Sequence, residues 1–318
     1  MRPPKSSPKH RTQTTPRTQI EQVVQKPHIV QNELHTPYID KHTIHTFHDG
    51  RFGYTHLQDI QDNHTTDTSV SIWTQDTSDM EVVVKTMPIL SNIEEEEVDE
   101  VKYLRECRGH AHIVNYISHV NYISHPHSDG SSYMRLVMDK CDGQELFQFI
   151  IDNDPIDLDV VCNISRQLLD TVRFLHEDRQ IVHRDIKPEN IMYNSKTGVI
   201  QLIDFGYACR CTGHLIYGDV GTPYYKAYEI VKRMGYTSKV DEWSAGVVLF
   251  MLLYGSAPFN GHTDDDIFRA IRKKAPQYPT CIRSHDAKRC VDMLLRTDSN
   301  QRATAREVLQ YPWFKANQ

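Results

Sequence analysis

The stretch IVHRDIKPENIMY (181–193), closely followed by VIQLIDFGYA (199–208), places polar side chains on short loops beside apolar strands. Short β-branched apolar runs bounded by polar turns are typical of buried strands. The polar residues carried by these loops are Asp185, Lys187, Asn190 and Asp204. A hairpin with a purely structural role does not need such a concentration of charge. The pattern therefore predicts a polar functional site held on β-structure.

A second apolar run, MEVVVKT (80–86), predicts a buried strand that carries Lys85 near its end. A lysine beside such a strand needs a counter-charge, because an unpaired buried cation is unfavourable. Downstream, three apolar residues recur at helical spacing: Val98, Val101 and Leu104. Glu100 lies at the edge of that apolar face, so we expect its carboxylate to meet Lys85.

Together these segments resemble the catalytic loop, the DFG motif and the strand lysine of protein kinases. Further segments follow in that family's order: GTPYYKAYE (221–229), DEWSAGVVLFMLLYGSAPF (241–259) and QRATAREVLQYPWF (301–314). The resemblance covers roughly residues 52 to 314 and is greatest to Ser/Thr kinases of the calcium/calmodulin-dependent and phosphorylase-kinase-like group. It implies a bilobal α+β fold, with a small β-sheet lobe carrying one main helix and a larger, mainly helical lobe.

The domain boundaries expected on this basis are a flexible tail over residues 1–48 and a kinase domain over 49–318. The small lobe would span about 49–138 and the large lobe about 139–318. The tail is basic and rich in Pro and Thr without apolar periodicity, so burial cannot offset the entropy of ordering it. In the large lobe, residues 158–176 predict a core helix with these residues on one face: Val161, Ile164, Leu168, Val172 and Leu175.

The resemblance implies transfer of the γ-phosphate of ATP to Ser or Thr hydroxyls of proteins, with Mg²⁺ as cofactor. Positioning and charge stabilisation supply most of the catalysis of such a reaction. Asp185 would accept or orient the proton of the acceptor hydroxyl, and Lys187 would neutralise the moving phosphate. Asn190 and Asp204 would hold Mg²⁺.

The nucleotide contacts implied by the resemblance begin with Lys85, which would clasp the α- and β-phosphates while Glu100 fixes it. Adenine would hydrogen-bond to the backbone around Asp139 and Cys141, behind Met138 as gatekeeper. These residues combine with the metal ligands to predict an ATP site.

The substrate side of the site is implied by three further residues. Thr222 would pack against Asp185, and its presence together with Lys187 favours Ser/Thr over Tyr as the acceptor. Glu145 and Glu189 would line the groove for residues that precede the acceptor. Because carboxylates pair best with arginine, we expect a preference for Arg three positions before the target.

The loop that should cover the phosphates departs from the family pattern of G-x-G-x-x-G. Counting back from Lys85 without gaps places Asn63, Thr65 and Thr68 at the three glycine positions and Val70 over adenine. Glycine permits positive φ and close approach of backbone N–H groups to phosphate. Losing it should cost about 1–3 kcal/mol, and thus weaken ATP binding roughly tenfold to a hundredfold.

One alternative concerns the position of this loop, and another concerns the function of the whole chain. A rival match with glycines, DGRFG (49–53), lies too far upstream of the strand lysine, and we therefore reject it. The competing function is a pseudokinase that binds partners through the same fold. Retention of the lysine, its glutamate and the loop residues of the catalytic and DFG motifs argues against that interpretation.

The activation segment, from Asp204 to Glu229, departs further from the family pattern. Tyr228 stands where the family has proline, while Glu229 is retained and should form a buried ion pair with Arg302. Asp219 is a candidate mimic of a phosphorylated residue. The candidate modification sites in the same segment are Thr212 and Tyr217. The sequence does not choose between these regulatory alternatives.

Composition excludes several classes of function. The formal net charge is −6, and the first 35 residues carry six Lys or Arg against two Glu, so the remainder is acidic. This balance disfavours nucleic acid or a membrane surface as a general partner. Seven scattered cysteines and the lack of an apolar leader lead us to expect a protein of the cytosol or nucleus.

Overall fold

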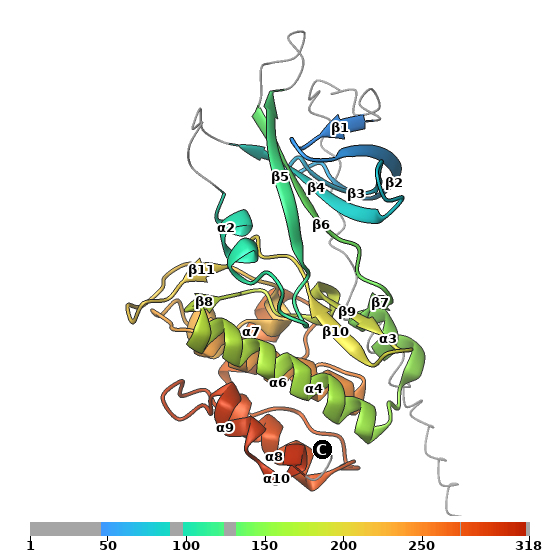
Figure 1. Cartoon of the computed structure of the whole chain (residues 1–318). Helices are drawn as coiled ribbons and strands as arrows, with labels where there is room; N and C mark the ends of the chain where they lie inside the picture. Colours follow the sequence, from blue (N-terminus) through green and yellow to red (C-terminus); the bar gives the residue numbers. More distant parts are fainter. Residues whose placement is uncertain (1–45, 90–97, 124–131, 274, 316–318) are drawn as a thin grey trace, which may run out of the picture.

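The structure, a computed structural model, describes residues 46–89, 98–123, 132–273 and 275–315. Figure 1 shows strands β1 to β6 at one end of the molecule and most of the helices at the other. The short strands β7 to β11 lie where these two parts meet. The bilobal α+β architecture predicted from the sequence is therefore confirmed.

The small lobe is an antiparallel sheet with the strand order β1-β2-β3-β4-β6-β5. Its strands are β1 (Thr46–His48), β2 (Gly53–Asn63), β3 (Thr68–Gln75), β4 (Glu81–Ile89), β5 (Tyr116–Ile123) and β6 (Ser132–Asp139). Helix α2 (Asp99–Glu106) lies beside this sheet (Figure 1). The strand predicted from MEVVVKT is β4, and its alternate residues Val82 and Val84 are fully buried.

Strand β1 occupies the last three residues of the segment that the sequence predicted to be a tail. Phe47 stacks on Tyr54 with ring centroids 4.8 Å apart, and its edge meets Trp73 at 4.9 Å. The folded lobe therefore begins at or before Thr46, because an aromatic side chain from this segment covers one face of the sheet. The rest of the predicted tail lies outside the described residues.

The rejected glycine match, residues 49–53, forms the turn between β1 and β2. The N–H of Asp49 donates to the carbonyl of Phe52 at 3.1 Å, and the Asp49 carboxylate accepts from the N–H groups of Arg51 and Phe52. This turn precedes β2, whereas the loop expected over phosphate follows it. Its place before β2 is consistent with the rejection of this match, which stays a prediction.

The large lobe is mainly helical. Its helices are α3 (Leu146–Asn153), α4 (Leu158–Arg173), α5 (Tyr228–Val231), α6 (Lys239–Tyr254), α7 (Asp264–Arg272), α8 (His285–Leu294), α9 (Ala305–Leu309) and α10 (Pro312–Lys315). The helix predicted over 158–176 is α4, which continues into one wider π turn, η2 (Phe174–Asp178). Its predicted inward face is buried throughout: Val161, Ile164, Leu168, Val172 and Leu175. Among the described helices, none combines the length and apolarity needed to cross a bilayer.

Five short strands anchor the polar loops: β7 (Gln144–Glu145), β8 (Ile181–Val182), β9 (Ile191–Asn194), β10 (Val199–Leu202) and β11 (Cys209–Arg210). Strands β10, β9 and β7 form one antiparallel sheet, and β11 pairs with β8 in another. Ile181, Val182 and Leu202 are fully buried, so both polar loops leave from packed strands. The loops are therefore held where the two lobes meet (Figure 1).

Candidate functional site

The loop between β8 and β9 holds Asp185 in a network of charge-assisted hydrogen bonds. Lys187 Nζ donates to Asp185 Oδ2 at 2.8 Å and to Thr222 Oγ1 at 2.9 Å. The Thr222 hydroxyl donates to Asp185 Oδ1 at 3.1 Å, and Asn190 Nδ2 donates to Asp185 Oδ2 at 3.0 Å. Both carboxylate oxygens are thus oriented, and the side chain is almost fully buried. Such charge-assisted bonds fix the position of the carboxylate.

A second cluster joins β4, α2 and the loop after β10. Lys85 Nζ lies 2.7 Å and 2.9 Å from the two carboxylate oxygens of Glu100, and 2.8 Å from Asp204 Oδ1. Burial by itself lowers the pKa of an ammonium, but Glu100 and Asp204 raise the pKa of Lys85 above its ordinary value. Burial raises the pKa of Glu100, against the opposing charge of Lys85. The lysine therefore remains a cation held between two carboxylates.

Asp204 reaches this cluster through an unusual backbone conformation. Its φ is +61°, a left-handed value that non-glycine residues adopt at a cost, often at functional sites. Although burial raises the pKa of Asp204, Lys85 and the N–H of Gly206 lower it below its ordinary value. The next residue, Phe205, is buried and packs edge-on against His183 at 4.9 Å. Asp204 is thus an ionised carboxylate locked in place by its neighbours.

The oxygen ligands of Asp204 and Asn190 fit a magnesium ion. Mg²⁺ usually takes one or two carboxylates together with substrate phosphates and water, so it does not need a cage made only of protein. Asn190 uses its side-chain nitrogen to donate to Asp185, which leaves the amide oxygen as a ligand. Within the described residues there is no group of three or more His, Cys, Asp or Glu arranged to hold a metal ion.

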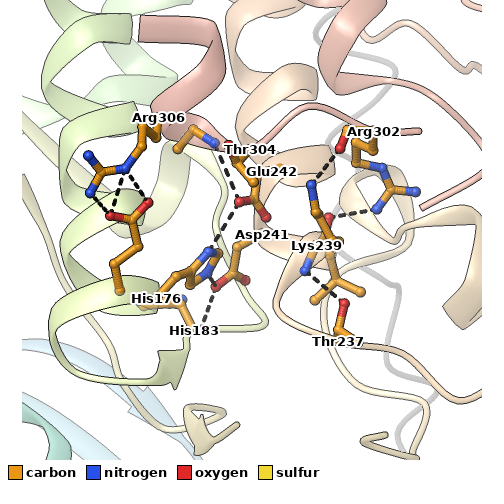
Figure 2. Close-up of polar contacts among 12 residues, drawn as sticks. His176, His183, Thr237, Lys239, Asp241, Glu242, Arg302, Thr304 and Arg306 are labelled. Carbon is orange, nitrogen blue, oxygen red and sulfur yellow. Dashed lines mark hydrogen bonds and ion pairs between the residues drawn. The ribbon is translucent and has the colours of Figure 1, made fainter. Parts of the chain in front are cut away.

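Beneath the loop of Asp185, helix α6 supplies a buried support that the sequence reasoning missed (Figure 2). The Asp241 carboxylate accepts from the backbone N–H groups of His183 and Arg184 at 2.8 Å and 2.9 Å. His176 from η2 lies between Asp241 and Glu242, 2.9 Å and 3.2 Å from their oxygens. Burial by itself lowers the pKa of a histidine, but the two carboxylates raise the pKa of His176 to about 10. A buried imidazolium therefore braces the carboxylate that shapes the loop.

The glycine-less segment forms the tip of the β2–β3 hairpin, where Asn63 pairs with Thr68. On the other side of β3, Val70 pairs with Lys85 of β4. Asn63 Oδ1 accepts from the N–H groups of Thr65 and Thr66 at 3.1 Å and 3.4 Å. The Thr68 hydroxyl donates to the Thr66 carbonyl at 3.3 Å. The tip is therefore closed by an Asx turn that directs its amides at its own side chain.

The residues predicted to meet adenine lie at the end of β6 and just beyond it. The N–H of Asp139 donates to the carbonyl of Asn115 at 3.0 Å, and Met138 is buried. Burial raises the pKa of the Cys141 thiol to about 12, so this side chain is a neutral thiol at ordinary pH. These residues form the connection from the sheet to the large lobe.

The predicted substrate carboxylates have different environments. Glu145 is exposed at the end of β7, immediately before α3. Glu189 is half-buried in the turn η3 (Pro188–Asn190) and accepts from the Tyr225 hydroxyl at 3.3 Å. Burial raises the pKa of Glu189. A cation bound there would be less hydrated than one bound at Glu145.

The activation segment is held by ion pairs on two sides. Arg302 forms a bidentate pair with Glu229 at 2.8 Å and 2.9 Å, which confirms the predicted pair. Asp219 Oδ1 lies 2.5 Å from Lys226 Nζ, so it pairs with a lysine within the segment. The candidate modification sites, Thr212 and Tyr217, are exposed. Their modification stays a prediction.

Comparisons with known proteins agree on one family. The sequence profile described as protein kinase domain matches residues 66–314. The chain is 37% identical over 226 residues to the phosphorylase b kinase gamma catalytic chain, liver/testis isoform, of Rattus norvegicus, covering 68% of this chain and 53% of that protein. It is 34% identical over 210 residues to calcium-dependent protein kinase 5 of Plasmodium falciparum (isolate 3D7), covering 64% and 37%.

A third relative, the serine/threonine-protein kinase PEPKR2 of Arabidopsis thaliana, is 36% identical over 219 residues, covering 68% of this chain and 44% of that protein. The chain thus matches about half, or less, of the length of these relatives. The match to the family profile, over residues 66–314, spans both clusters described above.

Proposed function

The chain belongs to the protein kinase domain family, and from this premise we propose that it transfers the γ-phosphate of ATP to Ser or Thr hydroxyls of protein substrates. The observation that carries the proposal is the network of Asp185, Lys187 and Thr222, which orients one buried carboxylate beside a cation. The ion pair of Lys85 and Glu100 supports the same proposal, because it supplies a fixed cation for the nucleotide phosphates.

In the proposed reaction the acceptor hydroxyl donates its proton toward Asp185 while its oxygen bonds to the γ-phosphorus. The bond from the γ-phosphorus to the β–γ bridging oxygen breaks, and ADP leaves. Lys187 Nζ, already held near Asp185, offsets charge on the transferring group. When bound, Mg²⁺ would neutralise phosphate charge, and Asp204 with Asn190 would hold it.

A second candidate function is a weakly active or inactive kinase fold that binds partners. The hairpin tip favours it, because Asn63 takes up the N–H groups of Thr65 and Thr66 that a phosphate would otherwise meet. Against this, the carboxylates and lysines of both clusters are present and paired. We therefore favour a kinase that holds ATP with reduced affinity.

The two candidates are separated by a transfer assay with γ-labelled ATP, Mg²⁺ and a mixture of basic Ser and Thr peptides. Label on Ser or Thr supports the enzyme, whereas a chain that transfers nothing under saturating ATP supports the partner-binding fold. A thermal-shift measurement with and without ATP and Mg²⁺ establishes separately whether nucleotide binds. Cytosol or nucleus remains the proposed location, to be tested by imaging the tagged chain.

Replacing Thr65 and Thr68 by glycine should lower the Michaelis constant for ATP by about three- to fivefold, with less effect on turnover. Glycine lets the backbone leave the Asx turn and close over the phosphates. The gain is limited because each glycine costs roughly 0.5–1 kcal/mol of ordering entropy. Steady-state kinetics with varied ATP measures the change, and Thr77→Gly in the turn after β3 serves as the control.

A sharp rise in the Michaelis constant would contradict this account, since it would make the threonine hydroxyls phosphate ligands themselves. If neither the double glycine variant nor the control changes the Michaelis constant for ATP, the loop that covers the phosphates lies elsewhere than at the positions counted back from Lys85.

Peptides with Arg three positions before the target should be preferred about tenfold in kcat/KM over the same peptides with Ala there. Glu145→Ala should remove most of this preference, because its exposed carboxylate would pair with that arginine. The control is Glu81→Ala, which removes an exposed carboxylate from the small lobe instead. A preference that survives Glu145→Ala unchanged would rule out this role for Glu145.

A further inference from the structure

Lys226 is a mostly buried cation in the segment that follows Thr222. It follows the turn η4 (Pro223–Tyr225), and its side chain is only 10% exposed. Together with Asp185, Thr222 and Tyr225, it lines a small cavity. The Thr222 hydroxyl, four residues earlier in the chain, bonds directly to Asp185. Lys226 therefore lines the same cavity as the carboxylate that would receive the acceptor hydroxyl.

The counter-charge for this ammonium is an accessible carboxylate. Asp219 Oδ1 lies 2.5 Å from Lys226 Nζ, and the Asp219 side chain is 57% exposed. A mostly buried cation needs an anion, whereas an ion pair that reaches solvent contributes little free energy. A carboxylate from a bound peptide can therefore replace Asp219 on Lys226 at little cost. Asp219 would then return to water, where it is fully hydrated.

The backbone around Asp219 allows such an exchange. Gly218 and Gly221 flank it with φ of +131° and +89°, conformations that glycine adopts without the penalty other residues pay. Val220 and Gly221 also line the cavity beside Asp185. The carboxylate is thus carried on a short segment with glycine on both sides, whereas the lysine directly follows the turn η4.

We propose that Lys226 makes this enzyme select an acidic residue immediately after the target Ser or Thr. The inference rests on the proposed function, in which Asp185 receives the acceptor hydroxyl. In that function Glu145 and Glu189 take residues that precede the target, which leaves the residue that follows it to the segment from Asp219 to Lys226. A carboxylate at that position pairs with Lys226, while a lysine or arginine meets a cation that is already nearly buried.

The test uses peptides that share one Ser and Arg at the third position before it, and that differ only in the next residue: Asp, Asn or Lys. For the full chain, kcat/KM should be about three- to tenfold higher for the Asp peptide than for the Asn peptide. The difference between the Asp peptide and the Lys peptide should be larger still. Lys226→Met should bring the Asp-to-Asn ratio near one, and Lys226→Arg should keep it. Asp219→Asn should increase the ratio, because it removes the competing carboxylate.

The matched control is Lys232→Met, which removes an exposed lysine six residues further along, outside the cavity. Equal kcat/KM for the three peptides in the full chain would overturn the inference while leaving the proposed kinase activity intact. A ratio unaffected by Lys226→Met, with a lower melting temperature, would make the pair purely structural. If no peptide is labelled, the proposed function fails, and equal binding of the three peptides by fluorescence anisotropy then overturns this inference separately.

Discussion

Replacing Asp185 by Asn should lower the rate of phosphoryl transfer by about 10²–10⁴-fold, while the affinity for ATP stays within about twofold. The asparagine keeps the shape of the side chain, its oxygen can still accept from Lys187 and its nitrogen can donate to the Thr222 hydroxyl, but it cannot take up the proton of the acceptor hydroxyl. Lys85, Glu100 and the proposed metal ligands are unchanged, so nucleotide binding should persist. Single-turnover transfer of labelled phosphate and equilibrium binding of ATP measure the two quantities separately.

The control for this variant is Asp286→Asn, which removes an exposed carboxylate from the first turn of α8. It should leave both transfer and ATP binding unaltered. Equal transfer by the original chain and Asp185→Asn would refute the role assigned to Asp185. Loss of ATP binding in Asp185→Asn would instead show that this carboxylate holds the nucleotide site together.

The loop that carries Asp185 was predictable because its polar residues are close neighbours along the sequence. Asp185, Lys187 and Asn190 lie within six residues, and the apolar runs on either side become the buried strands β8 and β9. The inward face of α4 was predictable for a similar reason, since one helical period repeats over four turns. Both predictions needed only residues that are neighbours along the chain.

The support beneath that loop was not predictable from such patterns. Asp241 and His176 are separated by 65 positions and meet only because α6 packs against the end of α4. Helix α6 is buried on nearly every side, so its sequence shows no polar face that would single out Asp241. Figure 2 shows how this buried group reaches both His176 and the backbone at His183.

Strand β1 was missed for a different reason. Phe47 is one aromatic residue within a polar segment, and a single residue produces no periodicity. Its contribution comes from partners that the sheet brings to it, namely Tyr54, Trp73 and the guanidinium of Arg135. The hairpin tip was predictable only in part. The position of Asn63 followed from counting back from Lys85, whereas its Asx turn depends on the conformation of the loop.

Replacing Arg302 by Met should destabilise the large lobe by about 3–5 kcal/mol. The guanidinium is fully buried, forms a bidentate pair with Glu229, and lies over the ring of Trp243 at 5.0 Å. It also donates to the carbonyls of Arg296 and Lys239. Methionine leaves the Glu229 carboxylate buried without its cation, so the cost exceeds that of the lost contacts alone. The melting temperature should fall by roughly 10 °C.

The matched control lies in the same region, where Arg306 pairs with Glu177 at the surface (Figure 2). Arg306→Met should change the melting temperature little, because an exposed ion pair is screened by water and salt. Adding Glu229→Gln to Arg302→Met should recover part of the lost stability, since the orphaned charge is then removed. Equal shifts in melting temperature for the two arginine variants, with no recovery in the double variant, would show that burial of the Glu229 carboxylate is not what makes Arg302 necessary.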